Sequence, residues 1–336
     1  MGGTRVDRIT RLGGSARVGD STPRMEECTM FANSLRNRRS RAGMVGAGVL
    51  AAGLVLVSGT ASGSSSSSDD LPDTISLVGV ARDFKRFDRA GGHPDFQQYN
   101  TGHIVGLVAE QLDQDGKPVF TGSRGKKVSR QYKDSAGRQI NPAMYNPALG
   151  DQAGSMSNYS GTTITNANSF SQWYRDVPGV NMSMQVPIVL QRMGDSNTYF
   201  FHAHDNSSTS AKEGFFPIDN QLLNDMDPTY HHNYFLTFEL DTEFMVEKNA
   251  GQVFTFYGDD DVWVFINGRM VIDLGGVHGA VSQSVSIDRL DWLADGERAQ
   301  LKLFFAERHL TLSNMRVETN LRLRPINVPP TTALYD

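Results

Sequence analysis

The chain has 336 residues, of which 39% are hydrophobic and 33 are glycine, and it carries a formal net charge of −5. This length allows one large domain or two modest ones, and the composition is typical of a globular, loop-rich and β-dominated protein. The single cysteine, Cys28, excludes a disulfide framework.

Residues 42–57, AGMVGAGVLAAGLVLV, form an uninterrupted run of apolar residues and glycine that follows a cluster of arginines. Together with the small residues that come next, this order predicts a secretory signal over residues 1–61, with cleavage after about Ala61. The expected location is therefore outside the cell or on its surface. An uncleaved N-terminal membrane anchor stays open as the alternative, although such a helix would reach only about 24 Å of a hydrocarbon core roughly 30 Å thick.

Removal of the signal would change the charge of the protein. Residues 1–61 hold nine arginines and four acidic residues, so residues 62–336 hold 23 basic and 33 acidic residues, a net charge of −10. This balance disfavours nucleic acid and anionic membrane as partners. Residues 62–336 contain no cysteine, and bound calcium is one candidate for the cross-link that secreted domains often need.

The elements expected along the chain begin after a serine-rich tether, residues 62–73, which contains SGSSSSSDD. From Thr74 the segment TISLVGVARDF alternates as a strand does. Residues 91–159 are polar and rich in Gly, Asn and Pro, which favours an elaborated loop region with short strands. From Phe170 strands and turns follow one another closely. We therefore expect one domain over 74–324, with its best-defined core at 170–324 and a tail at 325–336.

Two hairpins stand out in the second half of the chain. VPIVLQRM and NTYFFHAH flank the turn Gly194–Asn197, and VWVFI and RMVIDL are joined by Asn267-Gly268, the strongest two-residue hairpin signal. Both faces of VWVFI are apolar, so this strand is expected to be central in its sheet. Many antiparallel strands with few helical stretches predict an all-β protein, an antiparallel β-sandwich.

Three adjacent aspartates, Asp259, Asp260 and Asp261, lie between two strand-like segments. Neighbouring carboxylates repel one another and lose hydration near a core, so they require a cation, hydrogen-bond donors or open solvent. Clustered carboxylates on a loop suit calcium, whereas the alternative is a solvated acidic turn with side-chain caps to the backbone.

The segment GDDDVWVFINGRMVIDLGGVH resembles the signature of the fibro-slime domain family, secreted proteins of bacteria and social amoebae. Further pieces agree in order: RDF with HPDF, WYRDVPGVN, GFFPID, HHNYFLTFEL and FFAER. That family is similar in turn to the protective-antigen-type β-sandwich, which includes sugar-binding domains of flocculins and other adhesins. The resemblance implies this sandwich fold with long loop insertions.

In the lectin members, two adjacent aspartates joined by a cis peptide hold a calcium ion that also ligates sugar hydroxyls. Asp259 and Asp260 match that pair, and the resemblance therefore implies calcium as the cofactor. Asp261 stands where many relatives have glycine, so it either narrows the pocket or adds a weaker ligand. The lectin members also supply an asparagine from another loop, for which the sequence offers no assignment here.

Other candidate ligand-binding residues lie on either side of the aspartates. Tyr257 is placed for the rim of a sugar site, because aromatic rings stack on the apolar faces of sugars. Asp273 and His278 end the second strand of the Asn267-Gly268 hairpin, where a turn with a hydrogen-bonded histidine is the alternative.

These features predict a secreted or cell-surface module that binds extracellular glycans with calcium. The main alternative is a structural extracellular-matrix protein that binds protein neighbours and no sugar. We expect no enzymatic activity and no catalytic residue, although a glycosidase using Asp259 with a partner such as Glu307 stays open.

Overall fold

The structure is a computed structural model that describes residues 71–203, 214–310, 312–326 and 331. The predicted signal at 1–61 and residues 62–70 of the predicted tether lie outside the described residues. Within the described part of the chain, no helix is long and apolar enough to span a bilayer.

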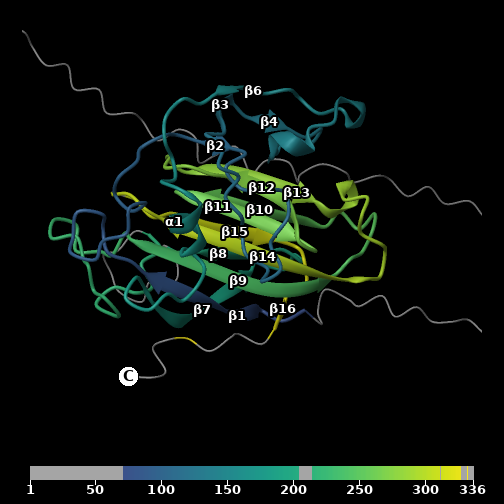
Figure 1. Ribbon diagram of the computed structural model, residues 1–336. Coiled ribbons are helices and arrows are strands. Elements are labelled where there is room, and N and C mark those ends of the chain that lie inside the picture. Colours follow the sequence, from purple (N-terminus) through teal and green to yellow (C-terminus); the bar gives the residue numbers. More distant parts are fainter. Residues whose placement is uncertain (1–70, 204–213, 311, 327–330, 332–336) are drawn as a thin grey trace, which may run out of the picture. The chain divides into compact units, whose positions relative to one another are not determined.

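One large antiparallel sheet contains most of the strands (Figure 1). Its strands are β1 (Thr74–Asp83), β7 (Met182–Arg192), β8 (Tyr199–His202), β9 (Leu236–Met245), β10 (Val253–Gly258), β11 (Asp261–Ile266), β12 (Arg269–Leu274), β13 (Val281–Ser286), β14 (Arg298–Glu307), β15 (Met315–Thr319) and β16 (Arg324–Pro325). Their order is β12-β11-β14-β9-β1-β7-β8-β15-β10-β13, and β16 pairs with β9.

This sheet curls until its first and last strands meet. The side chain of Gln283 on β13 bonds to the backbone of Asp273 on β12, accepting from its N–H at 2.9 Å and donating to its carbonyl at 3.0 Å. We call β12-β11-β14-β9-β1 the first layer and β7-β8-β15-β10-β13 the second layer. Phe256 and Phe305 pack across the interior between them, with ring centroids 6.4 Å apart. The predicted all-β antiparallel sandwich is confirmed.

The sequence predicted a central position for β11, but this strand lies second in the strand order, and both of its faces are nevertheless buried. Val262, Val264 and Ile266 face the core between the layers. Trp263 and Phe265 face a second, aromatic core on the outer side of the first layer. Loops and the short helix α1 (Ala167–Ser171) cover this outer core, which is why an apolar strand that is not at the middle of the sheet has no solvent-exposed face.

Both predicted hairpins are confirmed. Gln191 and Arg192 of β7 pair with Phe200 and Tyr199 of β8. Strands β11 and β12 are joined by Asn267 and Gly268, whose φ angles of 47° and 77° belong to the type of two-residue turn that this dipeptide favours.

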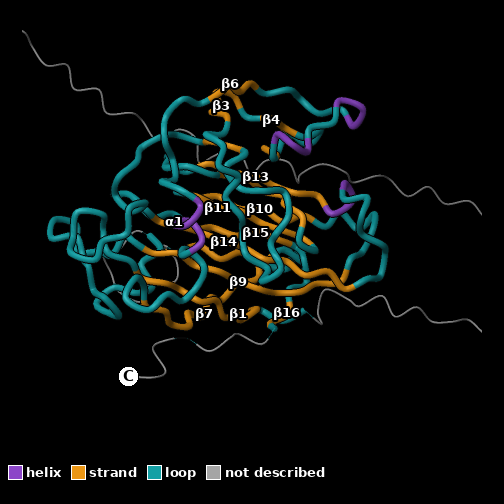
Figure 2. Tube along the Cα trace, in the orientation of Figure 1, coloured by secondary structure: helices purple, strands orange, loops and turns teal. Residues whose placement is uncertain are grey.

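Residues 104–158 form a lobe of short elements (Figure 2). Its strands are β2 (Ile104–Val105), β3 (Lys126–Arg130), β4 (Tyr132–Lys133), β5 (Gln139–Ile140) and β6 (Ser155–Asn158), with 3₁₀ turns at Pro142–Met144 and Pro147–Leu149; a further 3₁₀ turn follows β13 at Ile287–Arg289. Strands β2, β3 and β6 make a three-stranded sheet. A bridge between Ile104 and Gly275 connects the lobe to the end of β12.

Candidate cation site

Three connections cross from one layer to the other at the same end of the sandwich. Asp259 and Asp260 connect β10 to β11, residues 275–280 connect β12 to β13, and the segment after Glu307 connects β14 to β15. The ends of β10, β12 and β14 lie together at this end of the sandwich, because each of these strands ends beside the start of an antiparallel neighbour. The topology thus concentrates the side chains of these connections in one place.

Asp259 is held by the segment before β15. Its two carboxylate oxygens accept hydrogen bonds from the backbone N–H of Asn314 at 2.5 Å and from the side-chain amide of Asn314 at 2.8 Å. Burial raises the pKa of the Asp259 carboxyl, and the hydrogen bonds from Asn314 oppose this rise. Asn314 is therefore the residue from another loop that meets the first aspartate, and the sequence alone did not identify it.

Asp260 follows through a cis peptide bond and is also buried. Its carboxylate accepts the backbone N–H of His278 at 3.2 Å and that of Arg308 at 3.1 Å, so it touches both remaining connections. Burial raises the pKa of Asp260 well above its usual value; the Arg308 charge opposes this, and the neighbouring carboxylates of Asp261 and Asp259 add to it.

Asp261 has a different environment. One of its oxygens accepts the N–H of Gly276 at 2.5 Å, and the other pairs with Nε of Arg308 at 2.6 Å. Both side chains of this ion pair are 0% exposed. Arg308 also donates to the carbonyls of Asp95 and Thr163. Asp261 thus serves as the counter-charge of a buried arginine, and both of its oxygens are engaged.

Glu307 adds a further buried carboxyl beside the first two aspartates. Its Oε1 accepts the N–H of His309 at 3.3 Å, whereas its Oε2 is buried without a hydrogen-bond partner. Burial, followed by the charges of Asp260 and Asp259, raises the pKa of Glu307 well above its ordinary value. A buried acceptor without a donor is costly, so this oxygen indicates a site for a proton or a cation.

The structure brings two of the three other candidate residues to this end of the sandwich. His278 contacts Asp260 through its backbone, and its Nδ1 and Nε2 lie 2.9 Å and 3.2 Å from the carbonyl oxygens of Gly279 and Leu274. Tyr257 is 42% exposed and lies two residues before Asp259.

Asp273 lies elsewhere, on the floor of a cavity under the lobe. Its oxygens accept the indole N–H of Trp263 at 3.1 Å and the backbone N–H of Gly106 at 2.8 Å. Burial raises the pKa of Asp273 to about 7, although these hydrogen bonds oppose the rise.

Among the described residues, no three His, Cys, Asp or Glu side chains form a cluster with the geometry of a metal site. The candidate ligands are therefore the carboxylates of Asp259 and Asp260 and the side-chain amide of Asn314, and not a cluster of three acidic residues. Glu307 and Arg308 belong to the FFAER segment, but their position beside Asp260 follows from strand order and not from a local sequence pattern.

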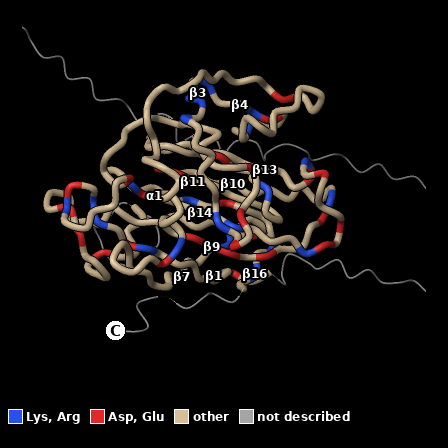
Figure 3. Tube along the Cα trace, in the orientation of Figure 1, with Lys and Arg blue, Asp and Glu red and all other residues tan. Residues whose placement is uncertain are grey.

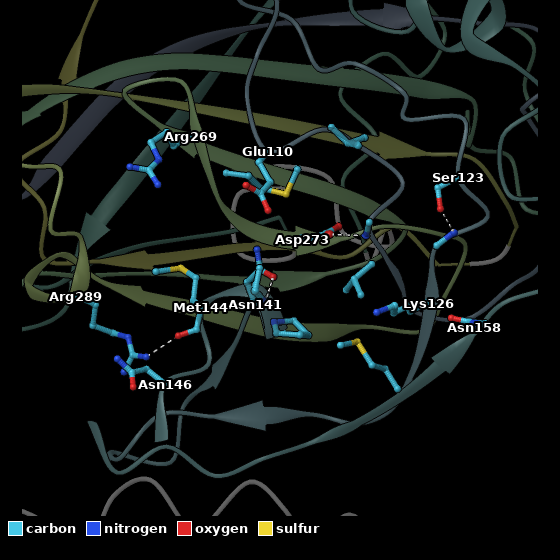
Figure 4. Close-up of a pocket in the computed structure, with 18 of the residues that line it drawn as sticks. Glu110, Ser123, Lys126, Asn141, Met144, Asn146, Asn158, Arg269, Asp273 and Arg289 are labelled. Atoms are coloured by element: carbon cyan, nitrogen blue, oxygen red, sulfur yellow. Dashed lines mark hydrogen bonds between the residues drawn. The ribbon is translucent and has the colours of Figure 1, made fainter. Parts of the chain in front are cut away.

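The cavity under the lobe has a volume of about 600 Å³ (Figure 4). Its polar lining comes from the lobe, from β12 and from the turn after β13, and includes Glu110, Ser123, Lys126, Asn141, Asn146, Asn158, Arg269, Asp273 and Arg289. Arg289 is paired with Asp151, at 2.6 Å. Arg269 stacks on Trp292, with its guanidinium carbon 4.0 Å from a ring centroid.

Comparison with known proteins shows similarity to the psi proteins of Dictyostelium discoideum. The chain is 30% identical to protein psiD over 258 residues, which cover 74% of this chain and 42% of psiD. It is 33% identical to protein psiJ over 250 residues, which cover 69% of this chain and 29% of psiJ. The chain thus spans less than half of the length of the curated relatives it matches.

No family model matches the chain. Among solved structures, the PA14 domain of the MpAFP antifreeze protein has 15% sequence identity and a TM-score of 0.19, and the match covers 26% of this chain and 42% of that chain. Such a score carries no argument about function. The chain is a homologue of the Dictyostelium psi proteins over about two thirds of its length.

Proposed function

We propose that this protein is a fibro-slime-type module, secreted or displayed at the cell surface, that binds extracellular glycans through a calcium ion at Asp259 and Asp260. The observation that carries the proposal is the meeting of Asp259, Asp260 and Asn314 at one end of the sandwich. Carboxylate and amide oxygens are the ligands that calcium prefers, and calcium completes its shell with backbone carbonyls and water or hydroxyl groups.

The residues present suit a hard cation. Each carboxylate oxygen of Asp259 and Asp260 accepts one hydrogen bond and keeps a second lone pair. Burial and the neighbouring aspartates raise the pKa of Glu307, and a bound cation would favour the ionised form of this carboxyl. Asp259, Asp260 and Asn314 would hold the ion, which would supply open coordination positions for sugar hydroxyls, while Asp261 would hold Arg308 in place.

Tyr257 supports a sugar as the ligand. Its ring is 42% exposed on β10, one residue before the strand ends at the aspartates. An exposed aromatic ring beside a cation gives a sugar both an apolar surface to stack on and a charge to coordinate. We propose Tyr257 and His278 as the rim of the site.

One observation favours the alternative, a structural matrix protein whose aspartates hold its own loops together. All four carboxylate oxygens of Asp259 and Asp260 accept hydrogen bonds from the protein itself. Under this alternative the sandwich would bind matrix proteins, and neither calcium nor sugar would affect it.

A glycosidase is the least supported function. Glu307, the potential partner of Asp259, is 0% exposed, and no sugar ring can lie between two carboxyls when one is sealed in the core. The psi proteins carry no enzymatic names.

Thermal unfolding in millimolar calcium and in chelator tests the cation site. Calcium should raise the melting temperature, because binding to the folded state alone adds about 2.7 kcal/mol at a hundredfold excess over Kd. Asp260→Asn should remove most of this rise while keeping the calcium-free fold, and Asp115→Asn, on a side chain that is 74% exposed, should keep the rise. An unchanged melting temperature in the unmutated protein would reject the cation.

A glycan array probed with and without chelator tests the ligand. Binding that chelator abolishes supports the proposed function. A calcium-dependent melting temperature with no glycan bound would support a structural cation, and release of reducing sugar would indicate an enzyme.

A further inference from the structure

Strand β3 carries an unusual concentration of positive charge for an acidic chain. Residues 124–133, RGKKVSRQYK, contain five basic residues and no acidic residue. They are Arg124, Lys126, Lys127, Arg130 and Lys133, and all five are exposed. Figure 3 shows this basic segment at β3 and β4. We call these five residues the β3 basic patch.

The charges of the patch are not neutralised within the described residues. None of the five side chains pairs there with a carboxylate. Lys127 lies 6.0 Å from the ring centroid of Tyr159, and Arg130 donates to the carbonyl of Gly154 at 3.4 Å. By contrast, the nearby Arg138 is paired with Asp134 at 2.7 Å. Cations that lie close together without a carboxylate partner repel one another, so their arrangement suits an anionic partner.

The patch continues into the cavity beneath the lobe. Lys126 belongs to both, and Figure 4 shows it beside Asn158 at one side of the cavity. Asn158 is exposed, and its side chain has no hydrogen-bond partner within the described residues. An amide that can both donate and accept next to an ammonium group suits a ligand with hydroxyl groups and a negative charge.

We propose that the β3 basic patch and the adjoining cavity form a second ligand site, which takes an acidic polysaccharide bearing carboxylate groups. The patch would hold the charges of the polysaccharide, and Asn158 would bond to hydroxyls of the residue that enters the cavity. This site uses none of Asp259, Asp260 and Asn314, so it is independent of calcium and of the proposed function.

The neighbourhood favours a polysaccharide over nucleic acid or membrane. The exposed side chains of β3 and β6, KKVSR and SMSN, are those of lysines, arginine, serine and asparagine, and neither strand carries an aromatic ring for base stacking. The apolar residues of these two strands are Val128, which is buried, and Met156, which is half-buried, so neither strand presents an exposed apolar side chain with which to enter a bilayer. The net charge of −10 on residues 62–336 opposes every polyanion alike, so the comparison with double-stranded DNA in the test decides between duplex and polysaccharide.

The test measures binding of the full chain to polygalacturonate at about 0.1 M salt in chelator, with neutral dextran and double-stranded DNA as comparison polymers. The double variant Lys126→Gln/Lys127→Gln should weaken polygalacturonate binding at least about tenfold, because two ionic contacts are lost. The matched double variant Arg298→Gln/Arg324→Gln, which removes two exposed charges from other strands, should leave it unchanged. Because residues 1–61 contain nine arginines, only differences among variants of the same chain report on the patch.

Asn158→Ala separates a sugar site from a simple ion exchanger. It should weaken polygalacturonate binding several-fold and leave DNA binding unaffected, since only the polysaccharide offers hydroxyls to the amide. The inference is overturned if polygalacturonate does not bind, if DNA binds as tightly with the same dependence on Lys126 and Lys127, or if the matched double variant weakens binding equally. Loss of polygalacturonate binding on Asp260→Asn would also overturn it, because binding would then belong to the calcium site.

Discussion

Asp261 and Arg308 depend on each other, because both are fully buried and each is the nearest opposite charge of the other. Asp261→Asn keeps the shape of the side chain but leaves the guanidinium without its counter-charge. We expect a loss of about 3–5 kcal/mol in the free energy of unfolding, as for other buried pairs from which one partner is removed. Urea denaturation measures this loss.

The control for this variant is Glu318→Gln. Glu318 pairs with Arg316 on the surface, where its side chain is 41% exposed, and such pairs contribute about 0–1 kcal/mol. If Asp261→Asn costs no more than Glu318→Gln, the carbonyl contacts of Arg308 and the nearby charges of Asp260 and Asp95 must suffice to stabilise it.

A separate prediction concerns how Asp273 makes the free energy of unfolding depend on pH. Its pKa is raised from 3.8 to about 7 in the folded protein, so stability from the neutral carboxyl is present below about pH 4 and is lost as pH rises through about 7. That rise in pKa corresponds to at most roughly 4 kcal/mol. Asp273→Asn cannot ionise, so it should gain stability relative to the unmutated protein as pH rises from 4 to 8.

The comparison between the variant and the unmutated protein is necessary because other groups act in both directions. The pKa of Asp83 is also raised to about 7, whereas that of His103 is lowered to about 4, which favours the folded state as pH rises. Free energies of unfolding at pH 4, 6 and 8 in chelator would show the effect. A constant difference between the two proteins would mean that Asp273 does not titrate in this range.

At the scale of elements, two glycines at strand ends should respond differently to alanine. Gly268 has a φ of 77° and open space around it, so Gly268→Ala should cost about 1 kcal/mol from backbone conformation alone. A Cβ at Gly258 would lie 2.0 Å from the carbonyl oxygen of Asn314. Gly258→Ala should therefore displace Asn314 from Asp259.

Calorimetric titration with calcium measures the difference between the two glycine variants. Gly258→Ala should weaken calcium binding strongly, whereas Gly268→Ala should bind calcium as the unmutated protein does. Equal affinities in both variants would remove Asn314 from the proposed ligand set.

The sequence predicted those elements whose signals are local. The Asn267-Gly268 turn and the two-faced apolar strand β11 require only neighbouring residues to be recognised. Asn314 could not be assigned, because it meets Asp259 only through the pairing of β10 with β15, which joins segments more than 50 residues apart. The short strands of the lobe were expected within an elaborated loop region, but their bounds could not be predicted, since they lack a continuous apolar face.

At the scale of the whole molecule, β1 lies in the interior of the sheet, between β9 and β7. Removal of β1 would expose both of these strands, so a fragment that begins near Phe170 should not remain folded. Limited proteolysis followed by mass spectrometry should yield a stable fragment that begins close to Thr74. A folded fragment that begins near Phe170 would instead show that residues 74–159 are a separate unit.

The positions of β1 and β16 have a consequence for how the domain is displayed. Thr74, where β1 begins, and Arg324 of β16 both lie at the end of the sandwich opposite Asp259 and Asp260, because β1 ends beside the start of β9 and β16 pairs near the end of β9. An attachment at either boundary of the domain would therefore leave the acidic end pointing outward. Within a longer chain, such an attachment would place Asp259 and Asp260 at the end of the domain farthest from its two chain connections.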